Sequence, residues 1–314
     1  MNQRLDFSVA LFAHIRRALI VAAMLLVCCA STHIDAQQKK KNEKTNNGAS
    51  LPSSSLSLPA LTRTTTRHEL RRFGYGSTLT LYGAPQGSIT IEAWTRSEID
   101  ITADIEVRAD TEDELTQLAA VNGFVIDDDI NHLTLLTTGT HDRKYMKRVA
   151  RDFPKKLLTM PWKIDYRIRV PASVDLEIYA GRGAFNLSGV EGALRLNGGE
   201  SIAALAPTGG SLEATFERGT INLRLTGRSW RGRGAQIRLA TGDINVELPA
   251  NFNADIDAAV LRSGRIENTY AGLAPRERTT QTEREQHLRS GVGGPAFSFT
   301  VGDGTLRIHQ ENKP

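Results

Sequence analysis

The chain has 314 residues, a hydrophobic content of 40%, an aromatic content of only 6%, and 27 glycines. This length can bury a hydrophobic core, and a glycine-rich, aromatic-poor composition is typical of many short strands joined by tight turns. The formal net charge of +4 at pH 7 is small for this length, and Lys and Arg are spread among acidic residues, which argues against a nucleic-acid-binding face.

The N-terminal residues have the pattern of a secretory signal. Two arginines precede an uncharged apolar run over residues 18–30, which is shorter than the ~20 residues of a membrane-spanning helix and has the length of a signal-peptide core. We predict that residues 1–36 are a signal peptide cleaved near Ala36, with Ala30 as the alternative site. The protein is then exported to the periplasm, the cell surface or the medium. If the run is retained instead, it anchors the chain to a membrane.

Both cysteines, Cys28 and Cys29, lie inside this run. Val27 precedes the first of them, whereas the acylated cysteine of a lipoprotein follows a small residue, so lipidation is disfavoured. After cleavage no cysteine remains, which predicts a mature protein without disulfides or thiolate metal sites. Residues 37–66 are polar and without periodicity, and we interpret them as a disordered tether.

Residues 67–170 contain several runs in which apolar and polar side chains alternate, as in half-buried strands. The predicted strands are residues 79–81, 89–94, 99–107, 124–126, 133–135 and 166–170. One helix is predicted over residues 112–121, where apolar residues at helical spacing follow an acidic start. The basic segment, residues 141–160, interrupts the strands. We interpret it as an exposed excursion, either a solvated loop or a short amphipathic helix able to meet an anionic surface.

Residues 171–314 repeat one unit, in which an apolar–x–apolar strand is followed by a glycine and a second such strand. The turn glycines are Gly183, Gly199, Gly219, Gly242, Gly264 and Gly304, and Gly87 has a similar place in the first part of the chain. A step of about twenty residues is typical of stacked repeats, and glycine suits their corners because it adopts positive φ without strain. We therefore predict one mainly β domain over residues 67–314: a parallel β-solenoid preceded by a mixed region of strands and a short helix. An antiparallel sandwich is the alternative.

The middle residue of successive first strands in these units alternates in charge. The residues are Glu177, Arg195, Glu213, Arg238 and Asp257. Strands in register lie about 4.8 Å apart, so this order would place each charge between opposite charges. We predict that these five residues form an outward charge ladder. A polar insertion at residues 271–295 is predicted to be a loop or short helix across one end of the solenoid, or a mobile arm.

Three runs of the sequence resemble a known family. They are GSITIEAW (residues 87–94), RVPASVDLEI (residues 169–178) and ATGDINVELP (residues 240–249). Together with the glycine-centred turns, they resemble the bacterial putative-adhesin family of β-strand-repeat envelope proteins, over roughly residues 77–310. The resemblance implies a β-repeat domain that follows a signal sequence or a membrane anchor. The biochemical function of that family is unknown, and it supplies no catalytic residues.

Sequence motifs of catalysis or metal binding are absent. No two histidines of the predicted mature chain have metal-ligand spacing, and no P-loop, nucleophile elbow or HExxH motif occurs. The acidic turn at residues 127–129 is interpreted as solvated rather than as a Ca²⁺ site. Trp230, which lies among arginines, is interpreted as a packed side chain rather than as a platform for a sugar or base. We predict no enzyme, no cofactor and no metal.

These patterns favour a non-enzymatic, exported module with a binding or scaffolding role in the cell envelope. Its partner would be an envelope polymer, a glycan or a protein, and not a nucleic acid. One alternative is a β-helical polysaccharide lyase or hydrolase, for which Asp243, Asp257 and Arg238 are the candidate catalytic residues. Another is an envelope scaffold or sensor associated with a membrane regulator.

Overall fold

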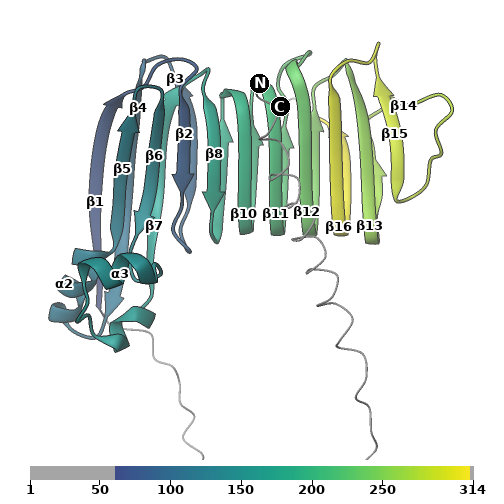
Figure 1. Cartoon of the computed structure of the whole chain (residues 1–314). Helices are drawn as coiled ribbons and strands as arrows, with labels where there is room; N and C mark the ends of the chain where they lie inside the picture. The colour runs from purple at the N-terminus through teal and green to yellow at the C-terminus, as the bar shows by residue number, and fades with distance from the viewer. Residues whose placement is uncertain (1–60, 312–314) are drawn as a thin grey trace, which may run out of the picture. The chain divides into compact units, whose positions relative to one another are not determined.

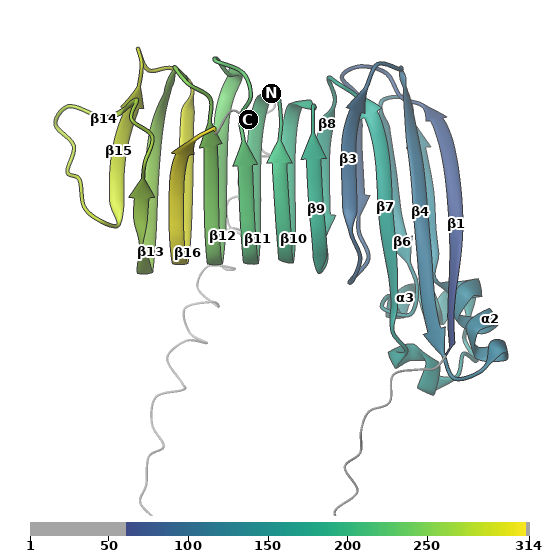
Figure 2. The same ribbon diagram turned by 180° about the vertical axis from the view of Figure 1, so that it is seen from behind.

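A computed structural model describes residues 61–311 (Figures 1 and 2). The predicted signal peptide and the predicted tether up to residue 60 lie outside the described residues. The described part is mainly β, as expected, and its strands form one 16-stranded sheet that is not closed. Pairs in this sheet are both parallel and antiparallel. No helix between residues 61 and 311 has the length and hydropathy needed to cross a bilayer.

The strands follow the chain in the order β1 (Leu61–Arg72), β2 (Thr78–Tyr82), β3 (Ile89–Trp94), β4 (Glu98–Ala109), β5 (Gly123–Asp129), β6 (His132–Thr138), β7 (Trp162–Pro171), β8 (Asp175–Ala180), β9 (Gly183–Ser188), β10 (Glu191–Ala206), β11 (Gly209–Arg224), β12 (Arg231–Leu248), β13 (Ala254–Asn268), β14 (Leu273–Pro275), β15 (Glu285–Ser290) and β16 (Ala296–Gln310). Helix α2 (Glu112–Val121), helix α3 (Arg143–Val149) and the 3-10 helix η1 (Lys155–Thr159) interrupt them. One path through the sheet runs β1-β4-β7-β3-β9-β10-β11-β12-β16-β13-β15-β14. The strands β5, β6, β2 and β8 join it at β10.

The long strands bend, so that one strand contributes to two faces of the molecule. In β10, residues 194–198 pair in parallel with β8, whereas residues 201–206 pair in parallel with β9. Figure 1 shows β8 on the side towards the viewer, and Figure 2 shows β9 on the opposite side. We call the β8 side the front face and the β9 side the back face. Alternate side chains point between the two faces, where they form one continuous hydrophobic core.

Strands β10 and β11 show how the repeat builds this core. They pair in parallel, with Leu194 opposite Leu212 on the front half and Leu205 opposite Leu223 on the back half. All four leucines are buried. Equivalent residues of neighbouring units therefore stack on each other, which is the pairing that the alternating pattern predicts for this part of the chain.

The corners between the two faces are built by a column of glycines. The column consists of Gly87, Gly183, Ser201, Gly219, Gly242, Gly304 and Gly264. At Gly219 and Gly242, φ is +131°, a conformation that side chains with a Cβ rarely adopt. A Cβ at either position would also overlap the carbonyl oxygen of the preceding residue in the column, which is Ser201 for Gly219 and Gly219 for Gly242. The prediction that Gly199 belongs to this column is wrong. In β10 the position opposite Gly219 is occupied by Ser201, and Gly199 lies two residues before it.

The strand order at the C-terminal end differs from the predicted succession of units. Strand β16 lies between β12 and β13 and pairs in parallel with both. The predicted insertion contains β14 and β15, and β15 pairs antiparallel with the first half of β13. The prediction of an entirely parallel arrangement beyond residue 171 is therefore wrong in this region. A repeat pattern identifies the units, but it does not state which units become neighbours when a long insertion lets the chain turn back.

The N-terminal edge begins earlier than predicted. β1 starts at Leu61, within the predicted tether, and pairs antiparallel with β4 over its whole length. Most of its side chains are exposed or half-buried, so the apolar alternation that marks other strands is missing. Helix α2 has the predicted bounds. It begins where the Thr111 hydroxyl accepts a hydrogen bond from the Glu114 amide (3.3 Å), which satisfies a free donor at the helix start.

A buried carboxylate connects the first three strands of the back face. Asp100 on β4 is buried, and it bonds to the guanidinium of Arg169 on β7 and to Nε2 of His68 on β1 (2.9 Å). Burial alone would raise the pKa of Asp100, but the hydrogen bonds from Arg169 and His68 outweigh it and hold the pKa below its ordinary value. The unfolded chain therefore binds a proton more readily than the folded protein does.

We expect the Asp100 cluster to make the domain sensitive to acid. The stabilisation is fully present above the unfolded pKa of about 3.9 and is lost as the pH falls through the lower folded value. Asp100→Asn should reduce the free energy of unfolding at pH 7 by about 1–2 kcal/mol and flatten its dependence between pH 5 and pH 2. Urea unfolding at a series of pH values measures both effects. Asp128→Asn, at an exposed hairpin position, is the control, and equal slopes for all three proteins would contradict the prediction.

Candidate functional site

The predicted charge ladder is present only in part. Glu177, Arg195 and Glu213 lie opposite one another on β8, β10 and β11. The next two residues of this row are Gln236 on β12 and Ser298 on β16, followed by Asp257 on β13. Arg238 is displaced by two residues and faces Thr215. The predicted alternation of charge from strand to strand therefore ends at Glu213, although the Arg238 guanidinium still lies 4.0 Å from the Glu213 carboxylate.

This register error has a simple physical cause. The pair Ile237 and Leu239 has the apolar–x–apolar pattern, but the residues opposite Leu212 and Ala214 are Ala235 and Ile237. Alanine carries little pattern signal, although Ala235 is buried. In the same pairing, the register shifts between Gly210 and Ser211, and a shift of this kind is not visible in the spacing of apolar residues.

Next to the charged row, four neighbouring strands expose large side chains at one register position. They are Val125 on β5, Leu136 on β6, Tyr82 on β2 and Tyr179 on β8. We call these four residues the tyrosine row. Each is between 38% and 47% exposed, on the outside of a sheet whose other front-face residues are mostly polar. Contiguous apolar exposure of this kind marks interaction sites more often than scattered single residues do.

The two tyrosines of the row are held in a fixed arrangement. Their rings are stacked, with centroids 5.0 Å apart and an angle of 3° between the planes. The Tyr179 hydroxyl donates a hydrogen bond to the Glu177 carboxylate (2.7 Å). Because this hydrogen bond requires the phenolic proton, it raises the pKa of Tyr179 above its ordinary value. The hydrogen bond to Glu177 thus holds the Tyr179 ring in place against the Tyr82 ring.

The tyrosine row continues into polar side chains on the same face. Asn197 on β10 lies opposite Tyr179, and Thr215 on β11 follows. Arg195 lies two residues before Asn197 and is also exposed. A ligand lying across the strands would thus meet aromatic and aliphatic surface first, and then amide, hydroxyl, carboxylate and guanidinium groups. Such a surface can bind an extended molecule that has apolar faces and many hydroxyls.

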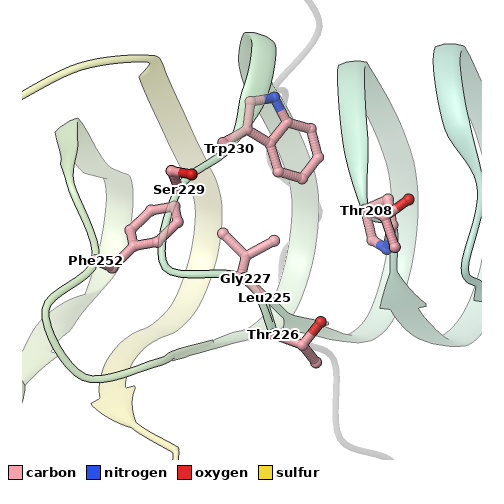
Figure 3. A pocket seen from close by; sticks show the side chains of 8 residues that line it. Thr208, Leu225, Thr226, Gly227, Ser229, Trp230 and Phe252 are labelled. Atoms are coloured by element: carbon pink, nitrogen blue, oxygen red, sulfur yellow. The ribbon is translucent and has the colours of Figure 1, made fainter.

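Trp230 forms part of a small pocket in the connection between β11 and β12 (Figure 3). Its indole is buried, donates a hydrogen bond to the Gly210 carbonyl (3.0 Å) and packs edge-on against Phe297. This confirms the interpretation of Trp230 as a packed side chain. The pocket has a volume of about 90 Å³, well below the roughly 300–1,000 Å³ of typical ligand sites.

A larger open groove of about 710 Å³ lies at the C-terminal end, between the loop after β14 and strand β15. Three of its charged or titratable side chains, Arg276, His287 and Arg289, are already paired. Asp257 bonds to Arg276 and to His287 Nδ1 (2.6 Å), and Arg289 Nε bonds to Asp255 (2.7 Å). These contacts connect the insertion to β13. They explain how the groove is held together without assigning it a ligand.

The structure does not bring together the candidate catalytic residues of a lyase. Asp243 pairs with Arg307 (3.0 Å) on the back half of its strand, and Asp257 pairs with His287 and Arg276 on the front half of β13. Arg238 lies 4.0 Å from Glu213. Between residues 61 and 311, no group of three or more His, Cys, Asp or Glu side chains has a geometry suited to a metal ion.

Sequence analysis missed the tyrosine row, although a signal for it exists. The runs LTLY at residues 79–82, LTLL at residues 133–136 and LEIY at residues 176–179 share one pattern. In each run a large residue occupies the outward position after the second inward residue. The outward positions of a half-buried strand are normally polar, so three large residues at one such position indicate an exposed surface.

No protein-family model matches the sequence, and no curated protein matches it. Among solved structures, the chain is similar to a "putative cell adhesion protein" from Clostridium sporogenes ATCC 15579, with 12% identity and a TM-score of 0.37, over 79% of this chain and 100% of that chain.

Two further solved structures are similar at the same level. A "putative adhesin" from Bacteroides fragilis NCTC 9343 has 13% identity and a TM-score of 0.32, over 79% of this chain and 97% of that chain. A "putative lipid binding protein" from Parabacteroides distasonis ATCC 8503 has 12% identity and a TM-score of 0.26, over 78% of this chain and 96% of that chain. The family resemblance stays a prediction.

Proposed function

We propose that this protein is an exported, non-enzymatic β-solenoid module of the cell envelope that binds a polysaccharide on its front face. The tyrosine row carries this proposal. A sugar ring has an apolar C–H face and a rim of hydroxyls, which match the rings of Tyr82 and Tyr179 and the polar groups beside them.

Two other features support the proposal. Strands β8, β10, β11 and β12 pair in parallel along the front face, so outward side chains recur about every 4.8 Å across the strands. This repeat suits a linear polymer of rings lying across the strands. The apolar run at residues 18–30 supports export, and an exported protein of the envelope meets polysaccharides there.

We expect Tyr82→Ala and Tyr179→Ala each to weaken glycan binding roughly tenfold, because each removes one ring of the stacked pair and the apolar contact that it offers. Binding of the full chain to a glycan array identifies the ligand class, and titration calorimetry with the best ligand gives the dissociation constants. Both side chains are partly exposed, so the variants should unfold at nearly the wild-type urea concentration.

Tyr75→Ala is the matched control, because Tyr75 is an exposed tyrosine outside the row. It should bind glycans as the wild type does. If the wild type retains no glycan, or if the Tyr82→Ala and Tyr179→Ala variants bind as tightly as Tyr75→Ala, the proposal is wrong.

A further inference from the structure

The basic segment concentrates positive charge in one place on an acidic domain. Residues 141–160 contain seven Lys or Arg and two Asp, a net charge of +5. The other described residues contain 24 Lys or Arg and 30 Asp or Glu, a net charge of −6. The small net charge of the whole chain therefore hides a strong local asymmetry.

The segment is folded, and its position is fixed. Met146 of α3 and Leu157 of η1 are buried, and Phe153 packs against the core. The Asp142 carboxylate accepts hydrogen bonds from the Lys144 and Tyr145 amides (2.8 and 3.0 Å), which stabilises the start of α3. Figures 1 and 2 show α3 and α2 together at the lower ends of the N-terminal strands.

The cations of the segment point to solvent and are nearly all unpaired. All seven are exposed: Arg143, Lys144, Lys147, Arg148, Arg151, Lys155 and Lys156. Of these seven cations, only Lys156 has an ion-pair partner among residues 61–311, and that partner is Glu114 of α2. Several arginines of the sheet, in contrast, are paired with carboxylates on neighbouring strands, as Arg167 and Arg307 are. The six unpaired cations of the basic segment thus leave a positive field for an external partner.

Exposed apolar side chains lie among these cations. Val149 at the end of α3 is 50% exposed, and Leu158 in η1 is 39% exposed. A surface with cations around a few apolar side chains is suited to the boundary between anionic headgroups and acyl chains, where both kinds of group find partners. An acidic polysaccharide or a nucleic acid would pair with the cations but would leave Val149 and Leu158 in water.

We propose that the basic segment is a docking surface for an anionic lipid bilayer. Lys147, Arg148 and their neighbours contact headgroup phosphates, and Val149 and Leu158 enter the interface. This surface shares no residue with the tyrosine row, so the two proposals are tested by different variants. Docking at this end would leave the front face free to bind a polymer while the domain is held close to a membrane.

The test compares binding of the full chain to vesicles of phosphatidylcholine alone and of phosphatidylcholine with phosphatidylglycerol, measured by co-sedimentation. We expect the wild type to prefer the anionic vesicles and to lose this preference at high salt. The double variant Lys147→Glu/Arg148→Glu should partition at least roughly tenfold less. Val149→Ser/Leu158→Ser should also weaken binding, and its remaining binding should stay salt-dependent.

The matched control is Arg228→Glu/Arg233→Glu, the same charge change at two exposed arginines, one in the β11–β12 connection and one at the start of β12. It should bind anionic vesicles as the wild type does, and the lysines of residues 37–60 are common to all variants. Equal losses in the two charge-reversal variants would show that only net charge matters and would overturn the proposal. The proposal is also overturned if the protein binds alginate or double-stranded DNA through Lys147 and Arg148 while its binding to vesicles does not depend on these two residues.

Discussion

Gly219→Ala is expected to lower the free energy of unfolding by about 3 kcal/mol, near the upper end of the cost of forcing a side chain into a glycine-only conformation. At Gly219, φ is +131°, and a Cβ would lie 1.8 Å from the carbonyl oxygen of Ser201 on the next strand. That oxygen belongs to the backbone of β10, so the overlap is relieved only by separating β10 from β11. At roughly 2–4 °C per kcal/mol, the midpoint of thermal unfolding should fall by about 6–12 °C.

Gly199→Ala is the matched control, because it changes a glycine of the same corner in β10. A Cβ at Gly199 would meet its nearest neighbour, the Gly181 carbonyl oxygen, at 3.6 Å, an ordinary contact, and φ there is not in the left-handed region. We expect Gly199→Ala to be neutral or stabilising by up to about 1 kcal/mol. Urea unfolding measures both variants, and similar losses at the two positions would contradict the glycine column.

The glycine column also shows what a sequence can and cannot reveal about this fold. The repeat of alternating strands and glycines predicts Gly219 and Gly242 as corners, because few other residues tolerate that backbone conformation. It does not reveal that Ser201 takes the place in β10, since the glycines of that strand, Gly198 and Gly199, lie three and two residues before the column. Strand content and core positions follow from local patterning, whereas the residue at each corner depends on how two strands are aligned.

The candidate site was less predictable for the same reason. Glu177, Arg195 and Glu213 could be predicted as neighbours, because β8, β10 and β11 follow one another without an insertion. Arg238 could not be placed, because a register shift precedes it. The tyrosine row brings Tyr82 next to Tyr179, nearly a hundred residues away in the sequence. The two tyrosines become neighbours only because β2 pairs with β8, and a local sequence pattern does not show which strands pair.

Phe297→Ala is expected to lower the free energy of unfolding by about 3–5 kcal/mol, the usual cost of removing a large buried aromatic side chain. Phe297 is 1% exposed, and its ring lies 5.6 Å from Trp230 and 5.5 Å from Phe252, centroid to centroid. In β16 it is placed between Ala235 of β12 and Ile256 of β13. The control is Val292→Ala, in the loop before β16, where the side chain is 88% exposed and the loss should stay below about 0.5 kcal/mol.

The same variant tests the order of the last strands. If β16 lies between β12 and β13, the cavity left by Phe297→Ala weakens the contacts on both sides. Amide hydrogen exchange should then accelerate in β13 and in the front half of β12, while β8 and β10 keep their protection at denaturant concentrations below the unfolding transition. Stacking in chain order would place β16 beyond β13, and faster exchange would stop at β13. Unchanged exchange in β12 would therefore show that β16 does not separate these two strands.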